Sequence, residues 1–219
     1  GNRIKKMINN SKMNSVLNYV FKNAKQDDPQ SVLNTIDSFV SETGTFLMNV
    51  GPEKGELLAE TIKDHKPLNT LELGSFLGYS AIIIAMFLPE AGSLVSVDHD
   101  KDSVAASKEI VKYAGLENKV HFINSTSDEA INALKESFDF IFIDHEKNRY
   151  YSDLLLMENL NLINKGGIVF ADNVGIFEDK MKDYFSHVRD SGAYTSKNIG
   201  AHLEYRDNVY DAVEISKFN

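Results

Sequence analysis

Apolar side chains recur every three to four residues through the first third of the chain, as they do on one face of an amphipathic helix. Asp28 followed by Pro29 is typical of a helix start, because aspartate caps the first turn and proline fits its first position. The spacing predicts three helices, over residues 15–25, 29–40 and 53–63. We therefore expect the N-terminal region to be helical.

From residue 70 the pattern changes to short apolar runs that alternate with helix-length segments. Strands are predicted at residues 70–73, 93–97, 120–123, 138–143 and 167–171, and helices at residues 80–87, 102–113, 127–134 and 151–160. Such alternation predicts right-handed crossovers and a parallel sheet covered by helices on both faces. Because ligands bind outside the carboxyl ends of the strands in such sheets, the residues at those ends are the first candidates for a functional site.

The chain beyond residue 172 is predicted to add one more helix and a pair of strands joined by a short turn. These elements are the helix at residues 178–188, the strands at residues 202–205 and 210–215, and the turn at Arg206, Asp207 and Asn208. The last two strands would then be antiparallel. Together the elements predict an α/β fold with a seven-stranded, mostly parallel sheet, and the absence of a linker or repeat in 219 residues predicts a single domain.

The first predicted strand runs into the segment LELGSFLGYS, which places Glu72 at the strand end and Gly74 and Gly78 before a helix that begins at Ser80. Glycine lets a ligand approach the backbone closely, and the free N–H groups of a helix start attract anions. The spacing is not that of the GxGxxG dinucleotide fingerprint, which counts against a NAD-dependent oxidoreductase. A tight turn without any ligand is the alternative at this position.

Polar residues also follow the second and third strands. Asp98 stands 24 residues after Gly74, where nucleotide-binding folds place a carboxylate that accepts both ribose hydroxyls. Alone, Asp98 would be read as a cap of the next helix, and the glycine loop is what favours a nucleoside-bearing cofactor. Ser127 and Asp128 could bind an adenine edge, or the same segment could cap a helix, and local sequence leaves this open.

The fourth strand ends in IFIDHEKNR and the fifth in VFADNV, which brings Asp144, Asp172 and Asn173 to neighbouring strand ends. Three oxygen ligands without any cysteine fit a hard divalent cation such as Mg²⁺. Either aspartate alone is more simply a helix cap, but both in one sheet favour a metal. Lys147 would lie close to that cation, which favours its neutral form and makes it a candidate general base. His145 shares the same strand end.

Composition narrows the function further. A net charge of −9 argues against a nucleic-acid partner and against a basic membrane-binding patch. The chain has no cysteine, so disulfides and thiolate chemistry are excluded. No apolar run approaches the roughly 18 residues of a membrane span, and no signal segment is evident, so we expect a cytoplasmic protein. The sequence begins with Gly1 rather than methionine, which leaves open a membrane anchor upstream.

Assembled in order, these motifs resemble the catechol O-methyltransferase family over most of the chain. The segments that carry the resemblance are DPQSVL at residues 28–33, MNVG at 48–51, LELGSFLGYS at 71–80, FIDHEKNRY at 142–150, ADNV at 171–174 and HLEY at 202–205. The resemblance implies a Rossmann-like class I methyltransferase fold, with residues 1–66 as a helical cap over the substrate site and residues 67–219 as the core. It also implies S-adenosylmethionine (SAM) as methyl donor, Mg²⁺ as metal and a small catechol as substrate. The sequence does not fix the oligomeric state, and we expect a monomer.

The resemblance assigns roles to individual residues. The donor would be bound at its methionine end by Val50, Glu72, Gly74, Tyr79 and Ser80, at its ribose by Asp98, and around its adenine by His99, Ser127, Asp128 and His145, with Asp144 close by. Asp144, Asp172 and Asn173 would bind Mg²⁺, Lys147 would be the base, and Glu204 would hold the second catechol hydroxyl. The substrate would also contact Phe46, Met48, Glu146 and Asn173.

Several positions depart from the family pattern. Glu146 and Phe46 stand where mammalian members carry wall tryptophans, Phe177 lies near the position of a wall proline, and His99 and Asp128 replace the residues expected beside adenine. A carboxylate at position 146 would favour cationic or more polar substrates. These departures concern the substrate and adenine surroundings, whereas the metal ligands and Lys147 match the family.

Two other functions are compatible with the sequence. The first is a related cation-dependent O-methyltransferase for larger phenolics such as caffeoyl conjugates, although the insertion loops of that group are not evident. The second is a SAM-binding interaction module without activity, which the presence of Lys147, Glu204 and all three metal ligands disfavours.

Overall fold

The N-terminal region consists of helices, as predicted. The computed structural model describes residues 10–45, 47 and 49–219 of the chain. The first helices are α2 (Ser11–Asn23), α3 (Pro29–Thr43) and α4 (Gly51–His65). Asp28 caps α3, because its Oδ1 accepts the backbone N–H of Ser31 at 3.0 Å, and Pro29 occupies the first turn. The start of this helix is therefore set by local sequence.

Within the described part of the chain, seven strands form one sheet in the order β3-β2-β1-β4-β5-β7-β6. The strands are β1 (Asn69–Leu73), β2 (Ser93–Asp98), β3 (Val120–Asn124), β4 (Phe138–Ile143), β5 (Ile163–Ala171), β6 (Tyr194–Leu203) and β7 (Arg206–Phe218). Strands β1 to β5 are parallel, and β7 runs antiparallel to both β5 and β6. The predicted α/β class, with a mostly parallel sheet and an antiparallel C-terminal pair, is confirmed.

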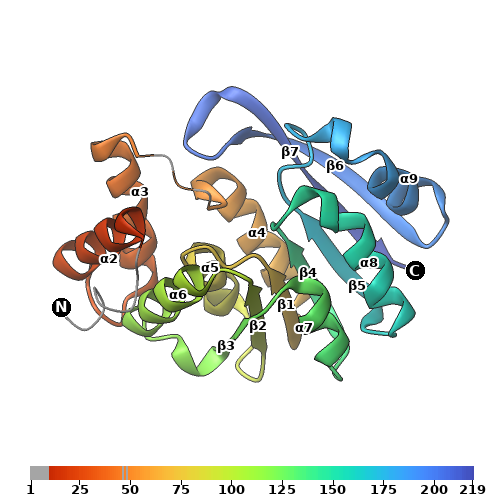
Figure 1. Cartoon of the computed structure of the whole chain (residues 1–219), viewed down its shortest axis with the longest axis horizontal. Coiled ribbons are helices and arrows are strands. Elements are labelled where there is room, and N and C mark those ends of the chain that lie inside the picture. The colour runs from red at the N-terminus through yellow and green to blue at the C-terminus, as the bar shows by residue number, and fades with distance from the viewer. Residues whose placement is uncertain (1–9, 46, 48) are drawn as a thin grey trace.

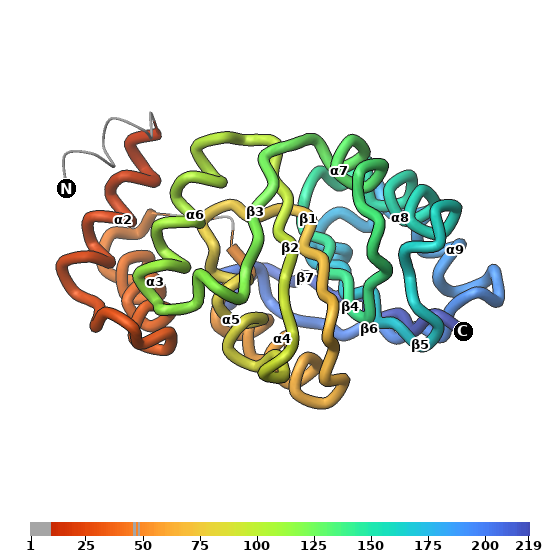
Figure 2. Tube along the Cα trace, turned by 90° about the horizontal axis from the view of Figure 1, so that it is seen from below, coloured from red at the N-terminus to blue at the C-terminus, as the bar shows by residue number. Residues whose placement is uncertain are grey.

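Helices cover both faces of this sheet (Figure 1). Besides the N-terminal helices they are α5 (Tyr79–Phe87), α6 (Lys101–Tyr113), α7 (Ser127–Ala133), α8 (Tyr150–Asn159) and α9 (Lys182–Asp190), with short 3-10 turns η1 (Glu117–Lys119), η2 (Lys147–Arg149) and η3 (Glu178–Lys180). Figure 2 shows α4 and α5 below the sheet and α7, α8 and α9 above it.

The strand β4 shows how the sheet is buried on both faces. Phe140 and Phe142 point into the apolar cluster shared with the N-terminal helices and α5, whereas Ile141 and Ile143 point into the cluster shared with α8 and α9. Alternate side chains of a strand point to opposite faces, so a strand covered on both faces is apolar at nearly every position, and in β4 only Asp139 is polar. This is why the run FDFIFI was recognisable as a central strand.

The strand order reverses between β1 and β4, which lie side by side. From β1 the chain continues to β2 on one side of the sheet, and from β4 it continues to β5 on the other side. In open parallel sheets such a reversal opens a crevice at the carboxyl ends of the strands. The segments that follow β1, β2, β4 and β5 meet at this edge. It is the edge on which the candidate residues were predicted.

The C-terminal hairpin differs from its prediction in two ways. Strand β6 begins at Tyr194, eight residues before the predicted start, because it is an edge strand with mostly exposed or half-buried side chains and no apolar run. The predicted turn at residues 206–208 is wrong. Arg206 already pairs with Leu203, and the turn is made by Glu204 and Tyr205, with Tyr205 at a φ of +58° that a tyrosine rarely adopts.

The predicted helix at residues 178–188 is also divided in the structure. A 3-10 turn at η3 ends before Met181, and α9 then runs from Lys182 to Asp190. Met181 is completely buried, so tertiary packing fixes the break between the two pieces. No helix among the described residues is both long enough and apolar enough to cross a lipid bilayer.

Candidate active site

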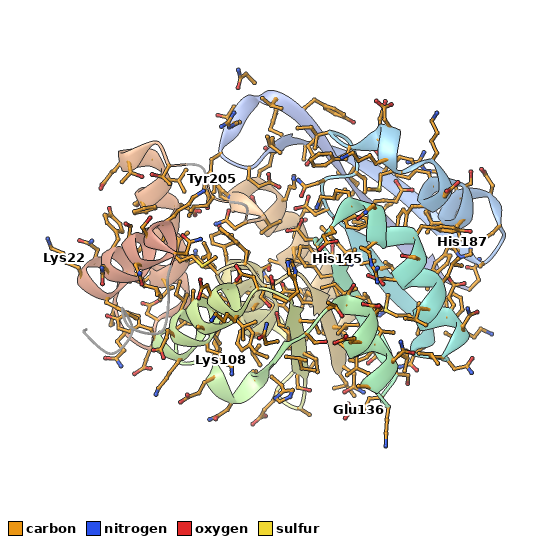
Figure 3. The ribbon with its side chains drawn as sticks, viewed as in Figure 1. Lys22, Lys108, Glu136, His145, His187 and Tyr205 are labelled. Atoms are coloured by element: carbon orange, nitrogen blue, oxygen red, sulfur yellow. The ribbon has the colours of Figure 1, made fainter. Side chains whose placement is uncertain are left out.

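A cavity of about 1330 Å³ opens at the carboxyl edge of the sheet, where the strand order reverses. Most of the predicted site residues line it: Gly74, Tyr79, Ser80, Asp98, His99, Ser127, Asp128, Asp144, His145, Glu146, Lys147, Asn173 and Glu204. In Figure 3, His145 lies near the middle of the molecule and Tyr205, next to Glu204, lies towards the N-terminal helices. Val50, Glu72 and Asp172 are buried behind this lining. Phe46 and Met48 lie outside the described residues.

Gly74 forms the closest approach between the first and fourth strand ends. Its N–H donates to the carbonyl oxygen of Val97 at 2.8 Å, and its φ is +106°. A Cβ at this position would lie 2.8 Å from the carbonyl oxygen of Asp144 and 3.2 Å from the nitrogen of His145. Only glycine therefore fits between the β1 loop and the segment of Asp144 and His145.

Asp98 is held by the backbone of the glycine loop. Its Oδ2 accepts the N–H groups of Ser75 and Phe76 at 3.0 and 3.2 Å, and its Oδ1 accepts the N–H of Asp100 at 2.9 Å. These bonds fix the carboxylate at the tip of β2 and leave lone pairs on both oxygens. The predicted ribose acid is thus oriented before any ligand binds.

Glu72 is completely buried beneath the loop and accepts hydrogen bonds from the hydroxyls of Ser80 and, at 2.6 Å, of Ser96. Burial raises the pKa of its carboxyl to about 8, although the two hydroxyl donors oppose this rise. The side chain therefore ties the end of β1 to the start of α5 from below the cavity. Tyr79, at that same helix start, donates to Asp37 of α3 at 3.2 Å.

The opposite end of the cavity is built around Asp153 of α8, a residue that the sequence did not single out. Its Oδ2 accepts the hydroxyl of Ser127 at 2.5 Å and lies 2.6 Å from Nε2 of His145. The ring of His145 stacks on Tyr150, and its Nδ1 is buried with no partner among the described residues. Asp128 pairs with Arg149 at 3.2 Å. Three predicted adenine contacts are therefore held in place by neighbours on α8 and η2.

The mouth of the cavity carries two of the residues that depart from the family pattern. Glu146 and His99 are 58% and 63% exposed, so neither is fixed by packing. Nδ1 of His99 lies 3.9 Å from Glu146 and 3.8 Å from Asp98. This exposed contact links the end of β2 to the segment after β4 across the mouth.

The predicted metal ligands lie on the adjacent ends of β4 and β5. The register pairs Ile143 with Ala171, and the N–H of Asp172 donates to the carbonyl oxygen of Ile143 at 3.0 Å, so Asp144 and Asp172 are neighbours. Burial raises the pKa of the Asp144 carboxyl to about 6, against the effect of the Lys147 ammonium. Burial, together with the charge of Asp144, raises the pKa of Asp172 well above its ordinary value. Two such carboxylates require a cation to be ionised together.

The free oxygens of this group are suited to a metal. Oδ2 of Asp172 is buried and has no hydrogen-bond partner among the described residues. The side-chain amide of Asn173 donates to Glu204 at 2.8 Å and to Asp211 at 2.9 Å, which fixes its orientation and leaves its oxygen as an acceptor. Asn173 also adopts a φ of +58°, which asparagine tolerates better than most residues. The residues present fit a hard divalent cation.

Lys147 stands beside these ligands. Its Nζ lies 3.3 Å from Oδ1 of Asp144 and donates to the hydroxyl of Tyr150 at 2.9 Å. That hydroxyl donates in turn to the carbonyl oxygen of Asp172 at 2.9 Å. Nζ also lies 5.9 Å from the ring centre of Phe177, which lines the same cavity. Lys147 is therefore anchored between Asp144 and Tyr150 at the wall of the open cavity.

The structure adds two charged residues that sequence reasoning missed, Lys54 and Asp211. Nζ of Lys54 lies 2.7 Å from Oδ1 of Asp172, 2.6 Å from Oε1 of Glu204 and 2.6 Å from Oδ2 of Asp211. Burial alone would lower the pKa of this ammonium, but the three carboxylates raise it above its ordinary value, so it stays charged.

A signal for Lys54 was present in the sequence. The buried face of α4 consists of Gly51, Lys54, Gly55, Leu58, Ala59 and Ile62, so the lysine occupies a core position at helical spacing. A lysine on such a face requires a buried counter-charge. Asp211 carries no comparable signal, because the run of residues 212–216 that follows it is buried throughout but contains Glu214 and Ser216.

The chain is similar to known O-methyltransferases. The sequence model of a family described as O-methyltransferase matches residues 23–189. Catechol O-methyltransferase of Mus musculus is 35% identical over 213 residues, which cover 95% of this chain and 79% of that protein. Catechol O-methyltransferase B of Danio rerio is 36% identical over 208 residues, which cover 93% and 77% of the two chains.

Solved structures share the fold at lower identity. The O-methyltransferase TomG from Streptomyces achromogenes, in complex with SAM, superposes with a TM-score of 0.76 at 20% identity, covering 90% of this chain and 92% of that chain. The O-methyltransferase from Bacillus cereus, in complex with SAH, gives a TM-score of 0.74 at 19% identity, covering 85% and 90%. These likenesses concern the fold alone.

The Rossmann-like sheet with this strand order is the fold of the class I methyltransferases. The chain belongs to the O-methyltransferase family, and its similarity to the catechol O-methyltransferases confirms the resemblance drawn from its motifs.

Proposed function

We propose that the protein transfers a methyl group from SAM to one hydroxyl of a catechol, with Mg²⁺ as the metal. The observation that carries this proposal is the grouping of Asp144, Asn173, Lys147 and Glu204 along one cavity, with Asp172 directly behind them. Oxygen ligands, an amine and a second acid are what a vicinal diol requires. The names of the Mus musculus and Danio rerio relatives support the same substrate class.

The donor would occupy the part of the cavity between the glycine loop and His145. Asp98 would accept the ribose hydroxyls, and Gly74 and the start of α5 would face the methionine end. Ser127 and His145, whose side chains are both hydrogen-bonded to Asp153, would border the adenine. Because these groups are already held by other hydrogen bonds, little ordering is needed when the donor binds.

The metal would be held by Asp144, Asp172 and Asn173. When bound, Mg²⁺ stabilises negative charge on the phenolic oxygens and so makes one of them a usable nucleophile near neutral pH. In its neutral form, Lys147 would receive the proton of the attacking hydroxyl at Nζ, which Tyr150 keeps beside Asp144. Glu204 accepts the other hydroxyl through its free oxygen and so orients the ring. Much of the rate then comes from holding donor and acceptor in line.

The surroundings of the ring suggest which catechols fit best. Glu146 places an exposed carboxylate at the mouth of the cavity, and Phe177 and Ile176 add apolar surface to its lining. We propose that catechols with a cationic or polar side chain are preferred. We also propose that residues 1–66 cover this end of the cavity as a cap, with Asn49 as part of its lining.

The test is an assay of methyl transfer from labelled SAM to a catechol, with Mg²⁺ or with EDTA. We expect transfer with Mg²⁺, loss of transfer with EDTA, and a fall of at least about a hundredfold in kcat for Lys147→Ala. Lys180→Ala is the matched control, because Lys180 lines the same cavity without contacting a metal ligand. Transfer that ignores EDTA would exclude the metal mechanism. SAM binding without any transfer would support an inactive binding module.

A further inference from the structure

Lys54 is a completely buried cation that the proposed reaction does not yet use. Its ammonium contacts one oxygen of Asp172 and one oxygen of Glu204, and it leaves the second oxygen of each carboxylate without a bond to Lys54. Oδ1 of Asp172 accepts from Lys54 at 2.7 Å and from the N–H of Asn173 at 2.7 Å, while Oδ2 has no partner among the described residues. Oε1 of Glu204 accepts from Lys54 at 2.6 Å and from Asn173 at 2.8 Å. Among the described residues, no hydrogen bond reaches Oε2 of Glu204.

Asp211 fixes the ammonium from behind. Its Oδ1 accepts the backbone N–H groups of Gly175 at 3.1 Å and Ile176 at 2.8 Å, and its Oδ2 accepts from Lys54 at 2.6 Å and from Asn173 at 2.9 Å. Both oxygens are thus occupied by donors. Asp211 therefore anchors Lys54 to the backbone after β5 and has no oxygen left for a ligand.

The ammonium also fills a position that would otherwise attract a metal. Oxygens of Asp172, Glu204 and Asp211 lie within 4.8 Å of one another, and all three residues are buried. A divalent cation about 2.0–2.6 Å from each oxygen would fit there only if Lys54 were absent. With Lys54 in place, a metal has to bind on the other side of Asp172, where Oδ2 is free and Asp144 is the neighbour.

We propose that Lys54 is a positioning residue: its ammonium occupies the cluster of Asp172, Glu204 and Asp211, leaves one oxygen of Asp172 for the metal and one oxygen of Glu204 for the substrate, and keeps the metal out of the cluster. This inference rests on the proposed function. It assigns Lys54 no contact with substrate or donor, because its side chain is fully enclosed.

Two substitutions separate the charge of Lys54 from its volume. Lys54→Met removes the charge and fills most of the space, whereas Lys54→Ala removes both and leaves room for a cation between the carboxylates. Lys63→Ala is the control, because Lys63 lies on the exposed side of the same helix. SAM affinity measured by calorimetry reports whether each variant is folded, since Lys54 does not line the cavity.

The first measurement is a titration with Mn²⁺ followed by electron paramagnetic resonance, without SAM or catechol. We expect one bound Mn²⁺ per chain for the wild type, Lys54→Met and Lys63→Ala, and a second for Lys54→Ala. If Lys54→Ala unfolds without metal, its thermal unfolding is followed with and without Mn²⁺, and Mn²⁺ should raise its Tm more than that of the wild type. One site in Lys54→Ala, or an equal rise in Tm, would overturn the proposal.

The second measurement is steady-state methyl transfer at saturating Mg²⁺ and SAM. Both Lys54 variants should raise the catechol KM about tenfold or more, with a smaller change in kcat and a SAM KM within about twofold of the wild type. Wild-type KM values in both variants would contradict a positioning role. Absence of Mg²⁺-dependent transfer in the wild type would instead refute the proposed function, and the Mn²⁺ stoichiometry would still decide the role of Lys54.

Discussion

The close approach at Gly74 gives the sharpest prediction for binding and stability together. In Gly74→Ala the new Cβ would lie 2.8 Å from the carbonyl oxygen and 3.0 Å from the carbonyl carbon of Asp144. Both atoms belong to the backbone and cannot rotate away as a side chain could. The substitution must therefore move either the glycine loop or the segment that carries Asp144 and His145.

The cost of this substitution has two parts. A non-glycine residue at a φ of +106° is strained by about 1–3 kcal/mol. Overpacking against a rigid neighbour adds about 1–3 kcal/mol. Gly74→Ala should therefore lower the free energy of unfolding by about 2–6 kcal/mol, out of the roughly 5–15 kcal/mol of an ordinary domain.

Gly192→Ala separates the two parts. Gly192 has a φ of +82°, but a Cβ there would meet nothing within 4 Å, so only the strain remains. The loss of backbone freedom in the unfolded chain is the same for both substitutions and cancels in the comparison. Urea unfolding of both variants measures the difference, and calorimetry measures their affinity for SAM.

We expect Gly74→Ala to be less stable than Gly192→Ala and to bind SAM at least about tenfold more weakly, because the displaced segment carries Asp144 and His145. Equal stability of the two variants, together with wild-type affinity for SAM in Gly74→Ala, would refute the reasoning. It would mean that the β1 loop and the end of β4 can separate without cost.

Three further substitutions test single contacts. Between pH of about 4.5 and 8, Glu72 keeps a proton in the folded protein that the unfolded chain releases, so the free energy of unfolding should fall with rising pH by up to about 1.4 kcal/mol per pH unit. Glu72→Gln should remove this part of the pH dependence, as measured by urea titrations at several pH values. An unchanged slope in the variant would disprove the role of Glu72. Tyr150→Phe leaves Lys147 without its hydroxyl partner and should lower kcat about tenfold while SAM affinity stays unchanged; a wild-type kcat would contradict this. Tyr205→Phe removes a 2.8 Å hydrogen bond to half-buried Asp37. It should lower the free energy of unfolding by about 1–3 kcal/mol and raise the catechol KM. If neither quantity changes, this bond does not hold the hairpin turn.

Much of the fold followed from local patterns. The cap at Asp28 and Pro29 fixed a helix start, and the apolar run of β4, interrupted only by Asp139, identified a central strand. The positions of Asp144 and Asp172 then followed from topology, because parallel strands that lie side by side bring their carboxyl ends together. Each of these inferences needed only neighbouring residues and one general rule.

The C-terminal hairpin was predicted less well for a physical reason. Strand β6 lies at the sheet edge, where its side chains are mostly exposed and carry no apolar pattern. The turn at Glu204 and Tyr205 depends on a backbone conformation that the residue types do not favour. Tyr205 is held there by Asp37 and Asn49, which come from a distant part of the chain.

The sequence by itself therefore determined the class of fold, the carboxyl edge on which the site lies, and the acids and the lysine that face the cavity. Tertiary structure alone decided which oxygens of those acids are free. Lys54 lies 150 positions from Glu204 and 157 from Asp211 in the sequence. No local pattern of residues can indicate a pairing over such separations. A buried charge must find its partner in space, and folding brings α4, the end of β5 and the β6–β7 hairpin to one point.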